Sequence, residues 1–185
     1  KSGKKLCTID FPTTRGSSYA FSPDKKRVAV NRDHAVVVYD TSTGKRVSKL
    51  QKDAVFTVSD LRFTSEGTLL TNDPHAVREW NVETGKEVRD LGRGYHFTTS
   101  EFMLLTPGES GVVSSGNSNG GWQAQFWSDR KDKTTRTELK GRLLSTLPGN
   151  GVLLESWSDD QDSHLIVYRP GAEPVQLGLA GVNGP

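Results

Sequence analysis

Three of the four histidines stand at nearly equivalent positions of a sequence repeat. His34 and His75 are about 40 residues apart, a distance typical of one structural repeat, and His164 lies within one residue of the equivalent place further along the chain. Imidazoles bind metal ions and anions, so a shared site on one rim is one interpretation. The other is that each histidine occupies the same turn of a repeated unit, too far from the next for shared ligation at about 2 Å. The repeat favours the second interpretation, so we expect no metal site and no cofactor.

Other motifs with chemical potential are incomplete. Asp159–Asp162 resembles part of a calcium loop but lacks the glycine at position six and the glutamate at position twelve. Gly116–Gly121 is rich in glycine but has no Gly-Lys-Ser/Thr ending, as a phosphate loop requires. A Gly-x-Ser-x-Gly nucleophile motif is absent from the sequence. We therefore predict that the chain is not an enzyme.

Composition narrows the classes of partner. A net charge of +2 in 185 residues gives no argument for nucleic acid, and no apolar run approaches the ~20 residues that span a bilayer. The single cysteine, Cys7, forms no intrachain disulfide and is expected to pack as a small hydrophobe, which fits a cytoplasmic location. The stretch from Lys131 to Arg142 carries five basic residues; its alternation favours an exposed outer strand, and a surface for an acidic partner is the second interpretation.

A hairpin pattern is repeated in the sequence. Residues 36–47 form an apolar run that ends in Tyr-Asp, then a Thr-Gly-Lys turn and a second strand-like run, and the pattern returns at residues 77–88. Short β-branched runs with glycine at the turn predict strands, and a period of about 40–45 residues is typical of a propeller blade. We therefore predict an all-β chain, 1–185, forming a single β-propeller or propeller fragment of four-stranded antiparallel blades.

The repeat sets the expected boundaries of the blades. We predict four of them, at about 19–51, 60–92, 101–140 and 142–178. The third is about six residues longer than the usual period, and we expect the extra residues to form a flexible turn at Gly116–Gly121. Gly3 precedes Gly44 by the same interval that separates Gly44 from Gly85. Residues 3–9 are therefore expected to be the outer strand of a preceding blade whose three inner strands are missing.

The chain resembles the WD-repeat β-propellers, in a divergent form. Phe21-Ser22-Pro23-Asp24 matches the first inter-strand turn of that family, and aromatic residues stand at its Trp-Asp step: Tyr39, Trp80, Trp127 and Tyr168. Asp33 and Asp162 match the turn aspartate, whereas Pro74 and Gly121 replace it in the middle blades. The Gly-His pair is missing, so the Asp-His-Ser-Trp hydrogen-bond tetrad of the family is incomplete. The resemblance implies that the ring closes with a blade shared between termini or with further blades.

Propeller turns cluster on two faces, and loops on a rigid scaffold commonly carry binding. By resemblance, the preferred face is built from the outer-to-inner connections and the second turns. That face nominates nine residues for partner binding: Arg15, Arg32, His34, Asp53, His75, Arg93, Tyr95, His96 and Trp122. Trp122 and Tyr95 are the expected anchors, because each is an aromatic residue within a polar, glycine-rich loop. Burial under a neighbouring loop is the alternative for each.

We predict a non-catalytic protein-interaction, sensor or scaffold module, part of a larger signalling or effector protein. One alternative is a propeller hydrolase or lactonase with a metal in the central channel. The other is a half-propeller completed by a second copy, as a homodimer, or by additional blades.

Overall fold

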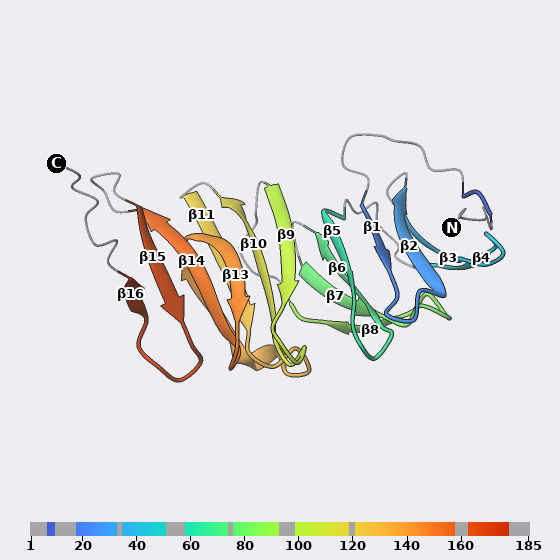
Figure 1. Cartoon of the computed structure of the whole chain (residues 1–185). Coiled ribbons are helices and arrows are strands. Elements are labelled where there is room, and N and C mark those ends of the chain that lie inside the picture. Colours follow the sequence, from blue (N-terminus) through green and yellow to red (C-terminus); the bar gives the residue numbers. More distant parts are fainter. Residues whose placement is uncertain are drawn as a thin grey trace, which may run out of the picture. The chain divides into compact units, whose positions relative to one another are not determined.

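All described strands belong to four antiparallel sheets of four strands each (Figure 1). The computed structural model describes residues 7–9, 18–32, 35–50, 58–73, 76–92, 99–118, 121–157 and 163–177. In every sheet each strand is hydrogen-bonded to the strand that follows it in the chain. The all-β prediction is thus confirmed, and we call the sheets blades 1 to 4 in chain order.

The first two blades lie in one compact unit, residues 1–94. Blade 1 consists of β1 (Tyr19–Phe21), β2 (Arg27–Arg32), β3 (Ala35–Asp40) and β4 (Arg46–Lys49). Blade 2 consists of β5 (Asp60–Phe63), β6 (Leu69–Asp73), β7 (Ala76–Trp80) and β8 (Glu87–Asp90).

The other two blades lie in a second compact unit, residues 95–185. Blade 3 consists of β9 (Thr99–Leu105), β10 (Val112–Ser118), β11 (Gly121–Trp127), a 3₁₀ turn (Lys133–Thr135) and β12 (Arg136–Lys140). Blade 4 consists of β13 (Arg142–Leu147), β14 (Gly151–Trp157), β15 (Ser163–Tyr168) and β16 (Val175–Leu177). Among the described residues, no helix has the length and apolar character needed to cross a bilayer.

The hairpin between the third and fourth strands is the same in blades 1 and 2. The N–H of Gly44 donates to the Asp40 carbonyl and the N–H of Gly85 to the Asn81 carbonyl, each at 2.8 Å, and both glycines have φ of +70°. The side-chain oxygens of Asp40 and Asn81 accept from the backbone N–H groups of the turn that follows. A short polar side chain and a left-handed glycine thus form the turn that the sequence predicted.

The core of the first unit lies between its two blades. Val36, Val38 and Ala29 of blade 1 are fully buried and belong to one cluster with Leu61, Leu69 and Trp80 of blade 2. Val36 and Val38 alternate along β3, as expected for a strand with one buried face, and Ala29 comes from β2. Packing between blades therefore buries the apolar face that a single four-stranded sheet would leave open.

The second unit is built in the same way. Phe126 and Ala124 of blade 3 pack with Leu143, Val152 and Leu154 of blade 4, and all five are buried. The rings of Phe126 and Tyr168 meet edge to face, with their centroids 5.9 Å apart, a favoured geometry for aromatic pairs.

Blade 2 contains buried polar contacts within its sheet. The buried indole of Trp80 donates from Nε1 to the hydroxyl of Thr71 at 2.9 Å. Asp73, one residue before the position where the repeat expects the turn aspartate, accepts from the N–H of Ala76 and pairs with the buried guanidinium of Arg78. The charge of Arg78 is therefore compensated inside the sheet, as a buried ion requires.

The prediction of a flexible turn at Gly116–Gly121 is wrong. β10 continues to Ser118 and β11 begins at Gly121, with Asn117 opposite Trp122 and Ser118 opposite Gly121. β10 and β11 have seven residues each, against five in β6 and β7. Part of the insertion thus lengthens both strands, because a hairpin that grows equally on both sides keeps its ladder of hydrogen bonds.

The close approach at Gly85 gives a test of blade packing. A Cβ at Gly85 would lie 2.3 Å from the Lys49 carbonyl oxygen, whereas a Cβ at Gly67 would meet nothing within 4 Å, although both glycines have positive φ. Gly67→Ala should cost about 1–2 kcal/mol of unfolding free energy from backbone strain alone. Gly85→Ala should cost a further 1–3 kcal/mol, roughly, because β4 must move away. Urea unfolding measures both; equal losses would contradict the contact.

Candidate functional site

Most of the nominated partner-binding residues lie outside the described residues. These are Arg15, His34, Asp53, His75, Arg93, Tyr95 and His96. Arg32 is the last residue of β2, and the structure describes its backbone only. Trp122 is the one nominated residue whose side chain is described, so the site is built from it.

Trp122 is the second residue of β11, not a loop residue as the sequence predicted. Its side chain is half-buried, and the guanidinium carbon of Arg142 lies 5.2 Å from its ring centroid. A guanidinium over an indole face is a cation–π contact. Its contribution is about 0.5–1 kcal/mol at an exposed site.

The chain brings Arg142 to this ring through Gly141, which joins β12 to β13. The N–H of Gly141 donates to the Trp122 carbonyl at 2.9 Å. Its φ is +127°, and a Cβ there would lie 2.6 Å from the Glu155 carbonyl oxygen. Only glycine fits this passage between blades 3 and 4, and the next residue is therefore placed beside Trp122.

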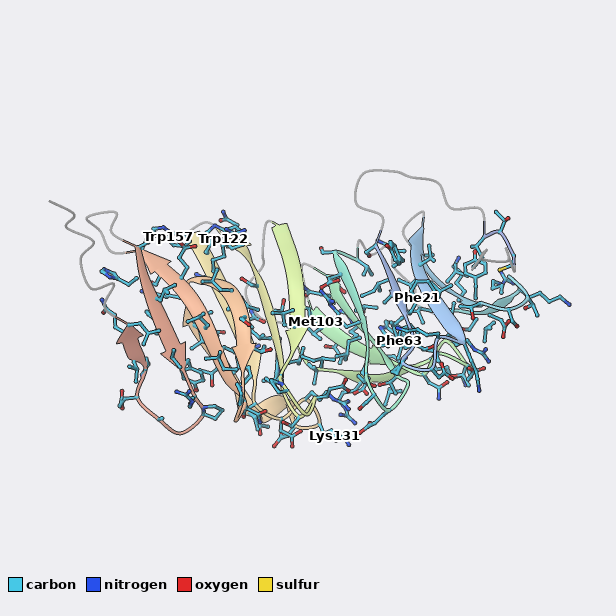
Figure 2. All side chains as sticks on the ribbon, viewed as in Figure 1. Phe21, Phe63, Met103, Trp122, Lys131 and Trp157 are labelled. Atoms are coloured by element: carbon cyan, nitrogen blue, oxygen red, sulfur yellow. The ribbon has the colours of Figure 1, made fainter. Side chains whose placement is uncertain are left out.

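A second tryptophan lies at the same end of the second unit. Arg142 is the register partner of Glu155 in β14, and Trp157 follows two residues later on the same face of the strand. Trp157 is 44% exposed. Figure 2 shows Trp122 and Trp157 at the same edge of the paired blades. We call Trp122, Arg142 and Trp157 the aromatic edge.

The aromatic edge is suited to binding rather than to bond making. Two indoles offer broad, rigid apolar surface with few rotatable bonds, and the guanidinium adds charge at the rim. None of the three groups is a general acid or base near neutral pH. The arrangement therefore fits recognition of another molecule.

The histidine pattern does not form a described metal site. His164 is the second residue of β15, where it pairs with Ser156 of β14, so it lies in a strand and not in a turn. Within the part of the chain that the structure describes, no three His, Cys, Asp or Glu side chains form a group that could hold a metal ion.

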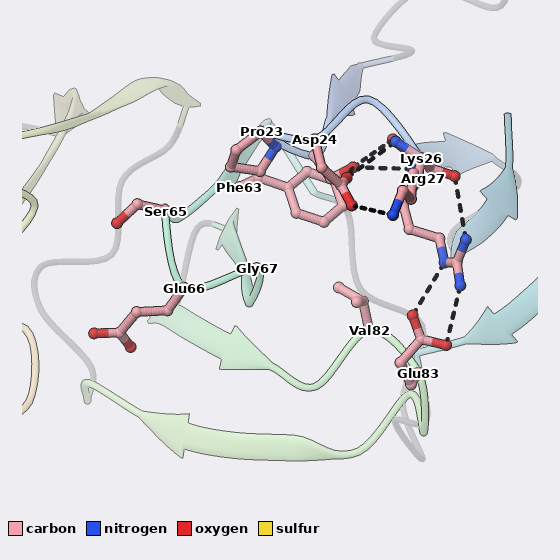
Figure 3. A pocket seen from close by; sticks show the side chains of 11 residues that line it. Pro23, Asp24, Lys26, Arg27, Phe63, Ser65, Glu66, Gly67, Val82 and Glu83 are labelled. Carbon is pink, nitrogen blue, oxygen red and sulfur yellow. Dashed lines mark hydrogen bonds and ion pairs between the residues drawn. The ribbon is translucent and has the colours of Figure 1, made fainter.

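Sequence reasoning missed a pocket of about 460 Å³ between blades 1 and 2 (Figure 3). Its walls are the β1–β2 turn with Asp24, the β5–β6 turn with Glu66, and the β7–β8 turn with Glu83. Phe63 and Val82 add apolar side chains to its lining. These turns lie at the opposite end of the strands from the second turns that the resemblance favoured. The sequence contained a signal for this pocket, because the first and third turns of each blade meet at one end.

Charges around this pocket are already paired. The Arg27 guanidinium donates to Asp40 at 2.8 Å and to Glu83 at 3.0 Å, and the bond to Glu83 raises the pKa of Arg27. Ser22 donates its hydroxyl to Asp24 at 2.6 Å, which lowers the pKa of that carboxyl. The same hydroxyl oxygen accepts from the Arg27 N–H, so Ser22 stabilises the turn. Arg27 thereby ties the third turn of blade 1 to that of blade 2.

Comparison with known proteins shows the fold. No model of a known protein family matches the chain, and no curated protein sequence is significantly similar to it. Hydrazine synthase of Kuenenia stuttgartiensis matches 90% of the chain with a TM-score of 0.64 and 13% identity. A protein described as TolB from Agrobacterium tumefaciens matches 88% with a TM-score of 0.58 and 14% identity. A eukaryotic initiation factor matches 94% with a TM-score of 0.56 and 17% identity.

These solved structures are propeller-type proteins, and with the four-stranded blades they confirm a propeller-type fold. At such low identity the likeness shows the fold alone. The chain matches 55%, 61% and 47% of the length of the three proteins, respectively.

The Asp40 turn predicts acid sensitivity. The hydroxyl of Ser42 and the N–H and hydroxyl of Thr43 bind the Asp40 carboxylate and lower its pKa. A lowered native pKa adds stability that is complete above the unfolded value near 3.9 and is lost as pH falls below it. Asp40→Asn keeps the turn that Asn81 makes in blade 2 and should flatten the fall in melting temperature below about pH 4. Asn81→Asp should steepen it, and parallel pH profiles for all three proteins would contradict this account.

Proposed function

We propose that this chain is a non-catalytic protein-interaction module that binds its partner through the aromatic edge, within a larger signalling or effector protein. One observation carries the proposal. Trp122, with Arg142 over its ring, and the 44% exposed Trp157 lie at the same end of the second unit. Exposed aromatic residues grouped with arginine are typical of the residues that dominate binding energy at interfaces.

The scaffold beneath the edge supports this function. β10 and β11 pair over seven residues, and their base is fixed by the buried side chains of Phe126 and Trp127. The edge also crosses from blade 3 to blade 4, which share one core. A binding surface on such rigid strands loses little conformational entropy when a partner docks.

Charge near the edge indicates the kind of partner. Lys140 is exposed at the end of β12, two residues before Arg142. The partner that fits is an extended protein segment with an apolar side chain for the indoles and a carboxylate next to it. Covering the exposed part of Trp157 would contribute on the order of 1–3 kcal/mol.

The paired groups of the other pocket favour binding over catalysis. Arg27 is held by two carboxylates and Ser22 by its own turn, so neither side chain is presented as an activated nucleophile or base. The hydrolase alternative, which needs a channel metal, finds no supporting group among the described residues.

Peptide display on the immobilised chain tests the proposal. Peptides with an apolar residue beside Asp or Glu should be enriched, and Trp157→Ala should weaken the best of them about 30-fold or more, the loss typical of a hot-spot residue. Trp122→Ala should weaken them similarly. Val175→Ala is the matched control, because Val175 is 53% exposed on the outer strand of the same blade.

Circular dichroism and melting temperature of each variant separate loss of binding from loss of fold. Folded Trp157→Ala protein that binds the selected peptides as tightly as wild type would place the interaction surface elsewhere.

A further inference from the structure

Residues 7–9 contact blade 1 as the outer strand of blade 1 contacts blade 2. The Cys7 thiol donates to the Thr41 carbonyl at 3.2 Å, and the Ser48 hydroxyl of β4 donates to the Val82 carbonyl. Ser48 follows Cys7 by one repeat of the sequence, and Val82 follows Thr41 by the same interval. One hydrogen bond between blades is thus repeated with a thiol in place of a hydroxyl.

The turn glycines repeat the same relation. A Cβ at Gly85 would meet the Lys49 carbonyl oxygen of β4, and a Cβ at Gly44 would lie 3.5 Å from the Thr8 carbonyl oxygen and 3.3 Å from the Cys7 Cβ. Lys49 follows Thr8 by the same single repeat. Residues 7–9 therefore stand where the fourth strand of another blade would stand. Yet the sheets formed by the described strands include no partner strand for them.

Beside residues 7–9, blade 1 has an open apolar face. Tyr19 is 65% exposed and Phe21 is 49% exposed, and their rings meet edge to face at 6.2 Å. A groove of about 260 Å³ runs between these rings, Val28 and Val30 on one side and Cys7 and Ile9 on the other. The opposite face of blade 1, with Ala29, Val36 and Val38, is the one buried against blade 2.

Blade 2 shows what covers the equivalent face. Phe63 is the counterpart of Phe21 in the next repeat, since each is the last residue of the first strand of its blade. Phe63 packs against the core cluster to which blade 1 contributes. The phenylalanine that ends the first strand is therefore covered by blade 1 in blade 2. In blade 1 the equivalent phenylalanine, Phe21, is exposed.

We infer that the Tyr19–Phe21 face of blade 1 docks the three inner strands of a further blade, whose fourth strand is residues 7–9, and that these strands come from the same polypeptide, on the N-terminal side of residue 1. Within every described blade the inner strands precede the outer strand in the chain. The inner strands of the further blade should therefore precede residues 7–9. The propeller-type structures that match are also longer than the matched region.

A second copy of this chain fits the position less well. Each described blade already has four strands, whereas a four-stranded blade that includes residues 7–9 needs only three more. A complete blade from another copy would have to displace either its own outer strand or residues 7–9.

The test uses the natural gene product, purified in full. Its subunit mass should exceed the 20.3 kDa of these 185 residues. In that protein, Phe21→Ser should lower the melting temperature by about 4 °C or more, because it removes a buried ring. Val88→Ser is the control, since Val88 is 51% exposed on the outer strand of blade 2, and it should shift the melting temperature little.

Alkylation of Cys7, followed by peptide mapping, gives a second measurement. The further blade should shield the thiol, so Phe21→Ser should speed its alkylation about tenfold or more, while Val88→Ser should not. A monomeric product no heavier than these 185 residues would overturn the inference. So would a dimer that dissociates on Phe21→Ser, because the occupant would then be a second copy. Equal effects of the two variants in a longer product would overturn it too.

Discussion

The fold depends on the close approach of one blade to the hairpin turn of the next. At Gly85 the backbone of the turn lies so near the Lys49 carbonyl that a methyl group has no room, and the Ser48 hydroxyl bonds to the Val82 carbonyl beside it. This contact sets the separation at which Val36, Val38 and Trp80 share one core. A four-stranded sheet has two faces and little thickness, so it is stable only when such a neighbour covers it.

Much of this arrangement could be predicted from the sequence, because its causes are local. The spacing of Tyr39 and Trp80, the glycines at the turns and the short β-branched runs set the strand boundaries to within a few residues. The third blade could not be predicted as well. Gly116 and Asn117 have low strand propensity, yet they pair in a ladder, because the flanking strands hold them there. Cross-strand pairing outweighed local preference, and it placed Trp122 in a strand.

One residue of the proposed site, Trp122, was also nominated by the sequence. Trp122 was selected as an aromatic residue in a polar segment, and the structure describes it as half-buried under Arg142. Trp157 was not selected, because its place at the end of β14 follows from the register with Arg142 and not from any motif. The pocket lined by Phe63 and Glu83 was missed for a related reason, since it combines turns from two blades. Sites made by neighbouring repeats are properties of packing, and a single repeat contains only half of each.

The long hairpin of blade 3 also bears on how this molecule could change over generations. β10 and β11 are each two residues longer than β6 and β7, which moves the tip of the hairpin outward by about 7 Å while Val112 and Trp127 remain paired at the base. Insertions split equally between the two strands would lengthen the proposed binding surface while Phe126 and Trp127 stay buried at the base. On the proposed function, the specificity of binding could therefore diverge among descendants of this chain while the stability of the blade stays the same.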